Sequence, residues 1–388
     1  MHANRIADPS SSVRAGQRGF ALLLLLLALV LAGAFIIVSE ANSRISVSER
    51  RARTITVLAQ AKDALIARST LDNNRPGSLP CPDLNGDGTA DLLIGNQCPG
   101  YLGWLPWRTL GLPDPRDGFG ERLWYALSPT FRDDDSAEPI NNSTPALLTL
   151  DGVPGVAAIV FASGGALEGQ SRPSQNSGDY LEGENADGDN DYAGGPESAT
   201  FNDLALPLTG DELMRMVERR VAGEVLNRLD AYFAANGAYP YPATPGCTGG
   251  TCDSDRTVCR GRLPVHADLD SSGPGSVSMA DWAPSLPSWL TNNRWPGNLY
   301  YAVGSSSLKS PGTAITDNCN PNPTVDGVDF SLVLITPGPP KAGSVRPSTS
   351  LADYLDDAAN QDGWDGSGSP DAYVTPTSSA NDRIFRRP

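Results

Sequence analysis

The chain has 388 residues, with 40 glycines, 33 prolines and a formal net charge of −16 at pH 7. A chain this acidic is unsuited to binding nucleic acid, which requires a basic surface, and favours a solvated surface or one that binds divalent cations. Its length predicts two domains beyond an N-terminal segment.

The first predicted element is an apolar helix. Residues 18–38 read RGFALLLLLLALVLAGAFIIV, and no side chain from Phe20 to Val38 is charged or strongly polar. A helix over these residues is about 28 Å long, close to the bilayer core of about 30 Å. The leucine run 22–27 leaves no polar face, which argues against a surface helix. The sequence therefore predicts a transmembrane helix over residues 20–38.

A short motif precedes this helix. Residues 16–20 read GQRGF, so that a glycine followed by a phenylalanine opens the apolar run. This resembles the processing site of type IV prepilins and type II secretion pseudopilins. The resemblance implies a leader over residues 1–19 and cleavage between Gly19 and Phe20 by a prepilin peptidase, with methylation of the new N-terminus. A cleaved secretory signal and an ordinary signal anchor are the alternatives.

The same resemblance implies partners and a location. Partners would be the prepilin peptidase, other pilin or pseudopilin subunits and the bacterial inner membrane. The chain would cross that membrane once with a cytoplasmic N-terminus, and its heads would be periplasmic or in an extracellular filament. The chain departs from the family at Leu24, where glutamate is usual. This departure argues against a major pilin and favours a minor, tip-like or initiating subunit.

The sequence predicts that the first helix continues beyond the apolar run, and that a second helix and two sheets follow it. Residues 39–71 contain neither proline nor glycine, so the first helix should continue to about residue 71. A second helix is predicted over about 211–235, with a capping box at Thr209 and Glu212 and a stop at Gly237. The clearest strands are 123–127 and 156–161, which are rich in aromatic and β-branched residues.

The two halves of the chain repeat the same order of segments. LPCP, FGERLWYALSP and VAAIVFASGG in the first half correspond to YPYP, WPGNLYYAVGS and FSLVLITPGP in the second, and both halves then carry R-P-S followed by D-Y-L. The pattern predicts an α+β protein with a tandem duplication. The long helix would be followed by two heads, residues 72–208 and 209–388, each a helix with a small antiparallel sheet. Each head resembles that of the G-type major pseudopilin.

The cysteine count is even, which predicts disulfides in a chain with a membrane-targeting N-terminus. Cys81 and Cys98 are expected to close one local loop. Cys247, Cys252, Cys259 and Cys319 allow three pairings, and the sequence does not choose among them. With only two histidines in the chain, a zinc site is poorly supported.

The sharpest local motif predicts calcium. Asp83, Asn85, Asp87 and Asp91 occupy positions 1, 3, 5 and 9 of an EF-hand-type loop, and Thr89 would add its carbonyl at position 7. The twelfth position is Ile94 rather than glutamate. The alternative is a solvated turn that binds nothing.

A second acidic cluster follows the first predicted sheet. Asp187, Asp189 and Asp191 alternate along the chain, and their mutual repulsion favours a bound cation. The resemblance to pseudopilins also implies a structural Ca²⁺ here. The alternative is a disordered acidic loop. The second half carries an equivalent group, namely Asp356, Asp357, Asp362 and Asp365.

No arrangement for catalysis stands out. Leader removal would leave one histidine, His266, and the chain contains neither a G-x-S-x-G elbow nor a phosphate-binding loop. The sequence therefore predicts a minor pilin-like or pseudopilin-like structural subunit and no enzyme. The alternatives are a membrane- or tip-anchored adhesin that binds through the region of Trp104 and Trp107, and an anchored periplasmic enzyme. Most tryptophans are expected in the core.

Overall fold

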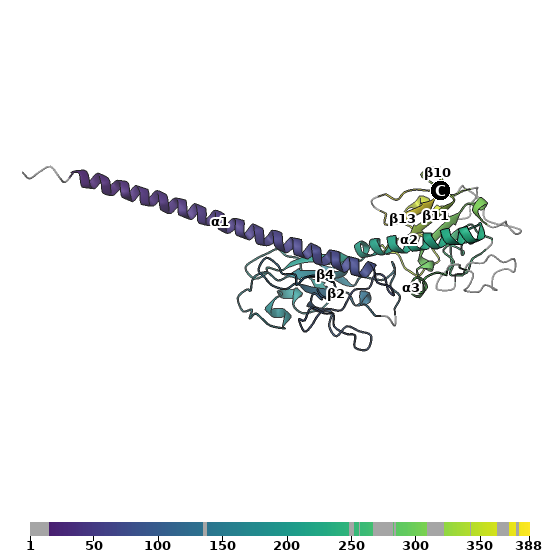
Figure 1. Cartoon of the computed structure of the whole chain (residues 1–388), viewed down its shortest axis with the longest axis horizontal. Helices are drawn as coiled ribbons and strands as arrows, with labels where there is room; N and C mark the ends of the chain where they lie inside the picture. Colours follow the sequence, from purple (N-terminus) through teal and green to yellow (C-terminus); the bar gives the residue numbers. More distant parts are fainter. Residues whose placement is uncertain are drawn as a thin grey trace, which may run out of the picture. The chain divides into compact units, whose positions relative to one another are not determined.

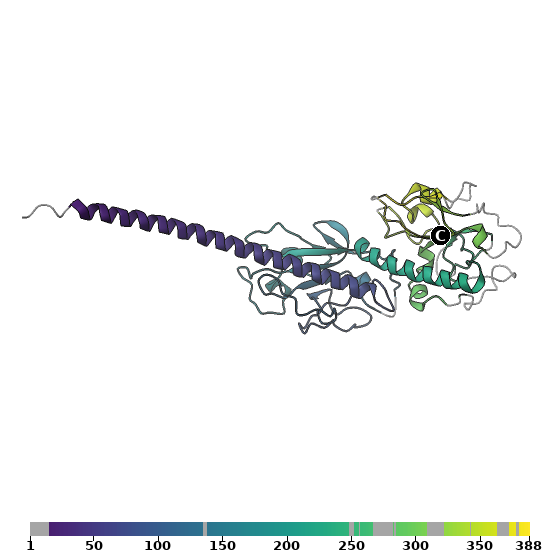
Figure 2. The same cartoon turned by 45° about the horizontal axis from the view of Figure 1, so that its top comes forward.

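A computed structural model describes residues 15–134, 138–247, 252–255, 257–266, 282, 285–308, 322–341, 343–362, 372–377 and 380–388 (Figures 1 and 2). Side chains are not described for residues 15–24, 35–45, 305 and 362. The chain is an α+β protein that divides into two compact units, Met1–Thr56 and Val57–Pro388. Both predicted heads fall within the second unit.

The N-terminal helix α1 spans Ala15–Thr70. In its last part Leu58, Ala61 and Leu65 are at most 2 % exposed. Their spacing of three and four residues places them on one face, which packs into the core of the second unit. The helix ends one residue before its predicted end, just ahead of the turn at Arg75–Gly77.

The predicted transmembrane helix is contradicted. In the part of the chain that the structure describes, no helix combines the length and the apolar character needed to cross a membrane. The side chains described within the apolar run are those of residues 25–34, and this much helix covers about 15 Å, half of a bilayer core. The prediction of a transmembrane segment over 20–38 was therefore wrong, and so was the single-pass inner-membrane location.

The first sheet has strand order β1-β2-β4-β3-β5, and β6 pairs with β4. Its two predicted strands are confirmed as β2 and β4. Successive side chains alternate between its faces: Tyr125 and Leu127 join the core that contains Leu58, whereas Trp124 and Ala126 join an aromatic cluster on the other face. The strands are β1 Leu102–Trp104, β2 Trp124–Leu127, β3 Leu148–Leu150, β4 Val153–Ala162, β5 Asp191–Tyr192 and β6 Leu204–Thr209.

Helix α2 spans Gly210–Asn236 and follows β6 without a loop. The Thr209 hydroxyl accepts a hydrogen bond from the Glu212 N–H at 3.1 Å, so the first turn of the helix is capped. Gly237 ends the helix with φ +69, a left-handed conformation that glycine adopts without strain. Both predicted ends of this helix are therefore confirmed.

The second sheet has strand order β13-β11-β8-β7, and α2 runs along it (Figure 1). A smaller sheet has the order β10-β9-β12, and two short helices complete the second half. The elements are β7 Arg260–Arg262, α3 Ser288–Asn292, β8 Tyr300–Val303, β9 Thr324–Val325, β10 Val328–Asp329, β11 Leu332–Thr336, α4 Ala358–Asp362, β12 Ala372–Tyr373 and β13 Arg383–Arg387.

The shared R-P-S and D-Y-L letters have a structural reason. Arg172 donates to the carbonyls of Gly164, Asp179 and Tyr180, and its guanidinium lies 4.7 Å from the centre of the Tyr180 ring. Arg346 makes the corresponding bonds to Gly338, Asp353 and Tyr354 and lies 4.7 Å from the Tyr354 ring. Each arginine thus ties the loop after the main strand to the tyrosine that follows it.

The cysteines and tryptophans follow the expected pattern. The Cys81–Cys98 disulfide is confirmed, and a second joins Cys247 to Cys252. Cys259 is also disulfide-bonded, while Cys319 lies outside the described residues. The tryptophans at 104, 124, 282, 289 and 295 are at most 9 % exposed, which confirms their expected place in the core. Trp364 is outside the described residues.

Candidate metal centre

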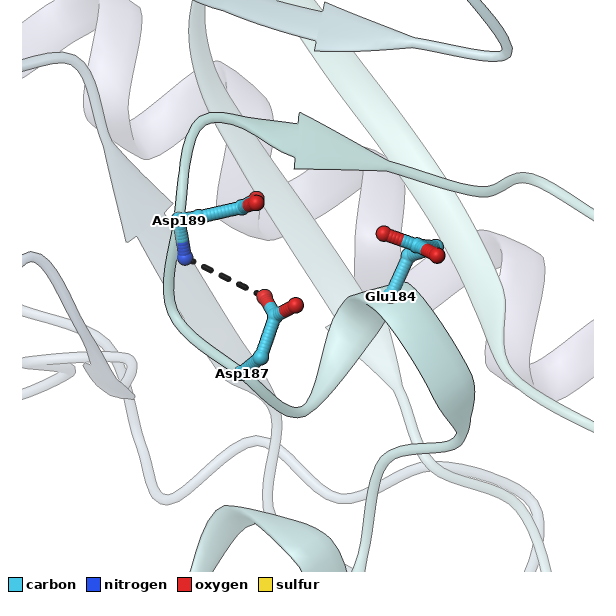
Figure 3. Close-up of side chains that lie close together, drawn as sticks. All are labelled: Glu184, Asp187 and Asp189. Atoms are coloured by element: carbon cyan, nitrogen blue, oxygen red, sulfur yellow. Dashed lines mark hydrogen bonds between the residues drawn. The ribbon is translucent and has the colours of Figure 1, made fainter.

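Three carboxylates converge beside the first sheet (Figure 3). Glu184, Asp187 and Asp189 each offer an oxygen within 4.8 Å of the others, and all three side chains are exposed. Glu184 lies on the 3₁₀ turn Gly183–Asn185, and the two aspartates lie on the loop that leads into β5. The Asp189 N–H donates to Asp187 Oδ1 at 3.2 Å, which bends the loop toward Glu184.

The loop is held by Asn185, which is fully buried. Its amide donates to the Ala193 carbonyl at 3.0 Å and to Asp203 Oδ2 at 2.9 Å, and its Oδ1 accepts from the Ala193 N–H at 2.8 Å. Asn185 and Ala193 therefore fix both ends of the segment that carries Asp187 and Asp189, and these two carboxylates lie beside that of Glu184, which directly precedes Asn185.

Asp191, the third predicted ligand, is placed elsewhere. Its Oδ1 accepts a hydrogen bond from the Thr149 hydroxyl at 2.5 Å, which ties β5 to β3. The structure thus groups Asp187 and Asp189 with Glu184 instead. The alternating spacing in the sequence favoured Asp191, but a short strand begins at that residue and turns its side chain toward the neighbouring strand.

The chemistry of the group suits a hard cation. Three carboxylates provide up to six oxygens, and Ca²⁺ takes six to eight at about 2.3–2.6 Å. Burial and then the negative charges of Asp189 and Asp187 raise the pKa of the neighbouring Tyr192 hydroxyl. The acidic group therefore creates a negative potential that a cation would neutralise.

The first predicted calcium loop binds its own backbone. Asp83 is 1 % exposed, and its carboxylate accepts from the N–H groups of Gly86 at 2.7 Å and Gly88 at 2.6 Å. Gly88 has φ +88, and a Cβ there would lie 2.4 Å from the Trp107 ring, so only glycine fits. Asp91 accepts from the Leu84 N–H at 2.9 Å.

The other side chains of this loop follow the same pattern. Asn85 Oδ1 accepts from the Asp87 N–H at 2.8 Å, and Asp87 Oδ1 accepts from the Thr89 N–H at 2.7 Å. Within the described residues, Asp83, Asp87 and Asp91 do not form a group of three converging carboxylates. These hydrogen bonds suit the alternative of a turn that is stable without an ion.

In the second half a lysine pairs with one member of the corresponding acidic group. Lys341 Nζ lies 2.6 Å from Asp356 Oδ2, whereas the corresponding Glu182 in the first half accepts from the Gln170 amide at 2.7 Å. The side chain of Asp362 and the whole of Asp365 lie outside the described residues.

Sequence reasoning missed a buried carboxyl group in each half. Asp203 accepts from the N–H of Glu182 at 2.9 Å, and Asp382 accepts from that of Asp356 at 2.9 Å. The signal was present, since each half carries the dipeptide Asn-Asp before its last strand. Burial is the main cause that raises the pKa of each of these carboxyl groups to about 7.

Comparison with known proteins gives no relative. No protein-family model matches the chain, and neither the curated proteins nor the solved structures contain a significant match.

Calcium is expected to stabilise the protein through the group of Glu184, Asp187 and Asp189. An ion that binds only the folded chain adds about 2.7 kcal/mol at a hundredfold excess over its dissociation constant, so the Tm of EDTA-treated protein should rise by about 5 °C. Differential scanning calorimetry with and without Ca²⁺ measures this rise. Asp187→Asn should remove most of it, whereas Glu168→Gln, an exposed change on the same half, should keep it. A Tm that does not respond to Ca²⁺ contradicts the site.

Proposed function

We propose that the chain is a minor pilin-like or pseudopilin-like structural subunit, which a prepilin peptidase cuts between Gly19 and Phe20. It acts by packing against other subunits rather than by catalysis. Gly19 and Phe20 lie in the part of α1 whose side chains the structure does not describe. The sequence motif alone therefore supports cleavage at this position.

The observation that carries the proposal is the apolar surface of α1. Six of its side chains between residues 25 and 31 are 51–67 % exposed, namely Leu25, Leu26, Leu27, Leu29, Val30 and Leu31. An exposed apolar surface of this kind marks an interaction site. The helices of other subunits would bury it, and burial contributes about 25 cal/mol for each Å² removed from water.

The adhesin alternative receives less support from the tryptophans. Trp104 is 7 % exposed and packs 5.0 Å from the Trp124 ring centre. Trp107 is half-buried, lies against Gly88 and is covered by the Arg108 guanidinium at 4.9 Å. These rings stabilise the first half and present little free aromatic surface to a ligand.

The test is to determine the N-terminal residue of the protein after expression with and without a prepilin peptidase. Intact mass and the N-terminal peptide should show a chain that begins at Phe20 and carries one extra methyl group, only when the peptidase is present. Gly19→Val should block the cut, and the matched change Gly16→Val three residues upstream should allow it. An uncut Met1 terminus in both cultures, or a cut at Ala34 or beyond, contradicts the proposal.

A further inference from the structure

A cavity of about 400 Å³ lies within the second unit, where residues 130–132 and 138–145 meet the second half. Its volume is in the range of pockets that hold small molecules. Three arginines line it, Arg132, Arg262 and Arg294, together with the carboxylate of Glu138. Arg132 pairs with Asp134 at 3.3 Å, so Arg262 and Arg294 carry the excess positive charge of the cavity in a chain with a net charge of −16.

Arg262 gives the cavity a buried positive charge. The residue is 1 % exposed and donates to the carbonyls of Pro245, Gly297 and Ser348. Its guanidinium lies 4.4 Å from the centre of the Tyr354 ring. Across the described residues, no carboxylate forms an ion pair with it. Carbonyl oxygens and the rings of Tyr300 and Tyr354 thus surround the guanidinium, and among the described residues no carboxylate balances its charge.

The first half shows that the fold does not need this charge. Arg262 forms an isolated β-bridge with Ala243, and Trp104 forms the corresponding bridge with Asp83. Each side chain also lies beside the tyrosine of the D-Y-L segment in its own half, Tyr354 and Tyr180 respectively. Trp104 is therefore the structural counterpart of Arg262, and an uncharged ring fills the same place. The positive charge is specific to the second half.

Arg294 adds a second guanidinium, which is exposed and has no side-chain partner among the described residues. Its backbone has φ +56, and it is the second residue after helix α3. This left-handed position after a helix is the one that glycine occupies most easily. An arginine is thus held in a conformation that disfavours it, with its side chain free at the cavity.

The backbone before Arg294 is fixed by Asn293, which is 2 % exposed. Its Oδ1 accepts from the Ile140 N–H at 2.9 Å, and its carbonyl accepts from the Asn141 amide at 2.8 Å. Both partners belong to residues 138–145, which also line the cavity. The backbone next to Arg294 is therefore fixed against this wall, while the exposed guanidinium is free to turn toward a ligand.

We infer that this cavity binds a small molecule that carries one carboxylate and several hydroxyl groups, such as a uronic acid. Arg294 would bind the carboxylate, and Arg262 would add its electrostatic attraction. Asn141, Thr144 and Asn298 also line the cavity. Each already makes hydrogen bonds within the protein, but an amide or a hydroxyl keeps a further donor or acceptor that would meet a sugar hydroxyl. The proline rings of the lining would pack against the sugar. Of the three arginines of the cavity, only Arg294 has a guanidinium without a side-chain partner among the described residues, and the Glu138 carboxylate repels further negative charge. The cavity therefore favours a ligand with one negative charge over a ligand with two.

The test is calorimetric titration of the full chain with glucuronate, with glucose as the neutral analogue and sulfate as the bare anion. Glucuronate is expected to bind at least tenfold more tightly than either. Arg294→Gly should weaken glucuronate binding at least tenfold, and its Tm should stay the same or rise because glycine suits φ +56. Arg219→Gln, which removes one exposed positive charge from α2, should leave glucuronate binding unchanged.

Three results would overturn the inference. One is the absence of glucuronate binding to the wild-type chain. Another is glucose or sulfate binding as tight as that of glucuronate. The third is unchanged affinity in Arg294→Gly. None of these depends on peptidase processing, so the inference and the proposed structural role fail separately.

Discussion

The free energy of unfolding is expected to fall as the pH rises from about 4 to about 7, because two buried carboxyl groups keep their protons in the folded chain. Burial is the main cause that raises the pKa of Asp203 and of Asp382 to about 7, and the nearby Glu182 and Asp356 charges add to it. In the unfolded chain both groups titrate near their usual value of about 3.9.

The sign follows from proton binding. Between about pH 4 and 7 the folded chain binds more protons than the unfolded one, so this contribution to stability is complete below pH 4 and is lost as the pH passes 7. Three pH units correspond to roughly 4 kcal/mol per group as an upper bound. Even about 2 kcal/mol for each group would be a large part of the free energy of unfolding, which is about 5–15 kcal/mol for a typical protein.

Thermal unfolding in EDTA from pH 4.5 to pH 8 measures the effect. Asp203→Asn and Asp382→Asn should each raise the Tm at pH 8, since an amide carries no charge to bury, and should each flatten the dependence on pH. Asp329→Asn, an exposed change in β10, should keep the dependence of the wild type. A pH dependence that neither buried substitution changes would contradict the raised pKa values of these carboxyl groups.

Glu218→Ala is expected to destabilise the protein by about 3–5 kcal/mol. Glu218 is fully buried on α2 and accepts from the Asn142 amide at 3.0 Å and the Gly338 N–H at 2.9 Å. It also pairs with Arg383. Burial raises the pKa of this carboxyl group and Arg383 opposes the rise. Alanine would leave the buried Gly338 N–H without its acceptor and Arg383 with only its longer pair, to Asp211 at 3.7 Å.

Chemical denaturation measures this loss, which should lower the Tm by on the order of 10 °C. Glu224→Ala is the matched control, since it breaks a partly exposed pair with Arg228 on the same helix and should cost about 0.5 kcal/mol or less. Adding Arg383→Met to Glu218→Ala should recover part of the stability, because it removes a largely buried guanidinium that has lost its nearer carboxylate. A loss in Glu218→Ala as small as that in Glu224→Ala would contradict the role of this carboxylate.

Local patterns predicted local structure well. The ends of α2 followed from Thr209, Glu212 and Gly237, because caps depend on residues a few positions apart. The two main strands followed from their β-branched and aromatic residues, and Cys81 paired with Cys98 because the chain between them is short.

Contacts between distant segments were beyond the sequence. The roles of Arg172 and Arg346 depend on carbonyls that only the folded loops bring together, and the burial of Asp203 depends on β6. Asp191 illustrates the same limit, since alternation along a chain does not say which way a carboxylate points. The apolar run led to a wrong prediction for another reason, because its composition alone was interpreted as a transmembrane helix.

The join between the two sheets has a mechanical consequence. Thr209 is both the last residue of β6, paired with Val156 of β4, and the residue that caps α2. No slack chain separates the first sheet from the helix that supports the second. A pulling force on the second sheet would therefore reach the first along the backbone at Thr209, and stretching would load the β4–β6 ladder before any linker could extend.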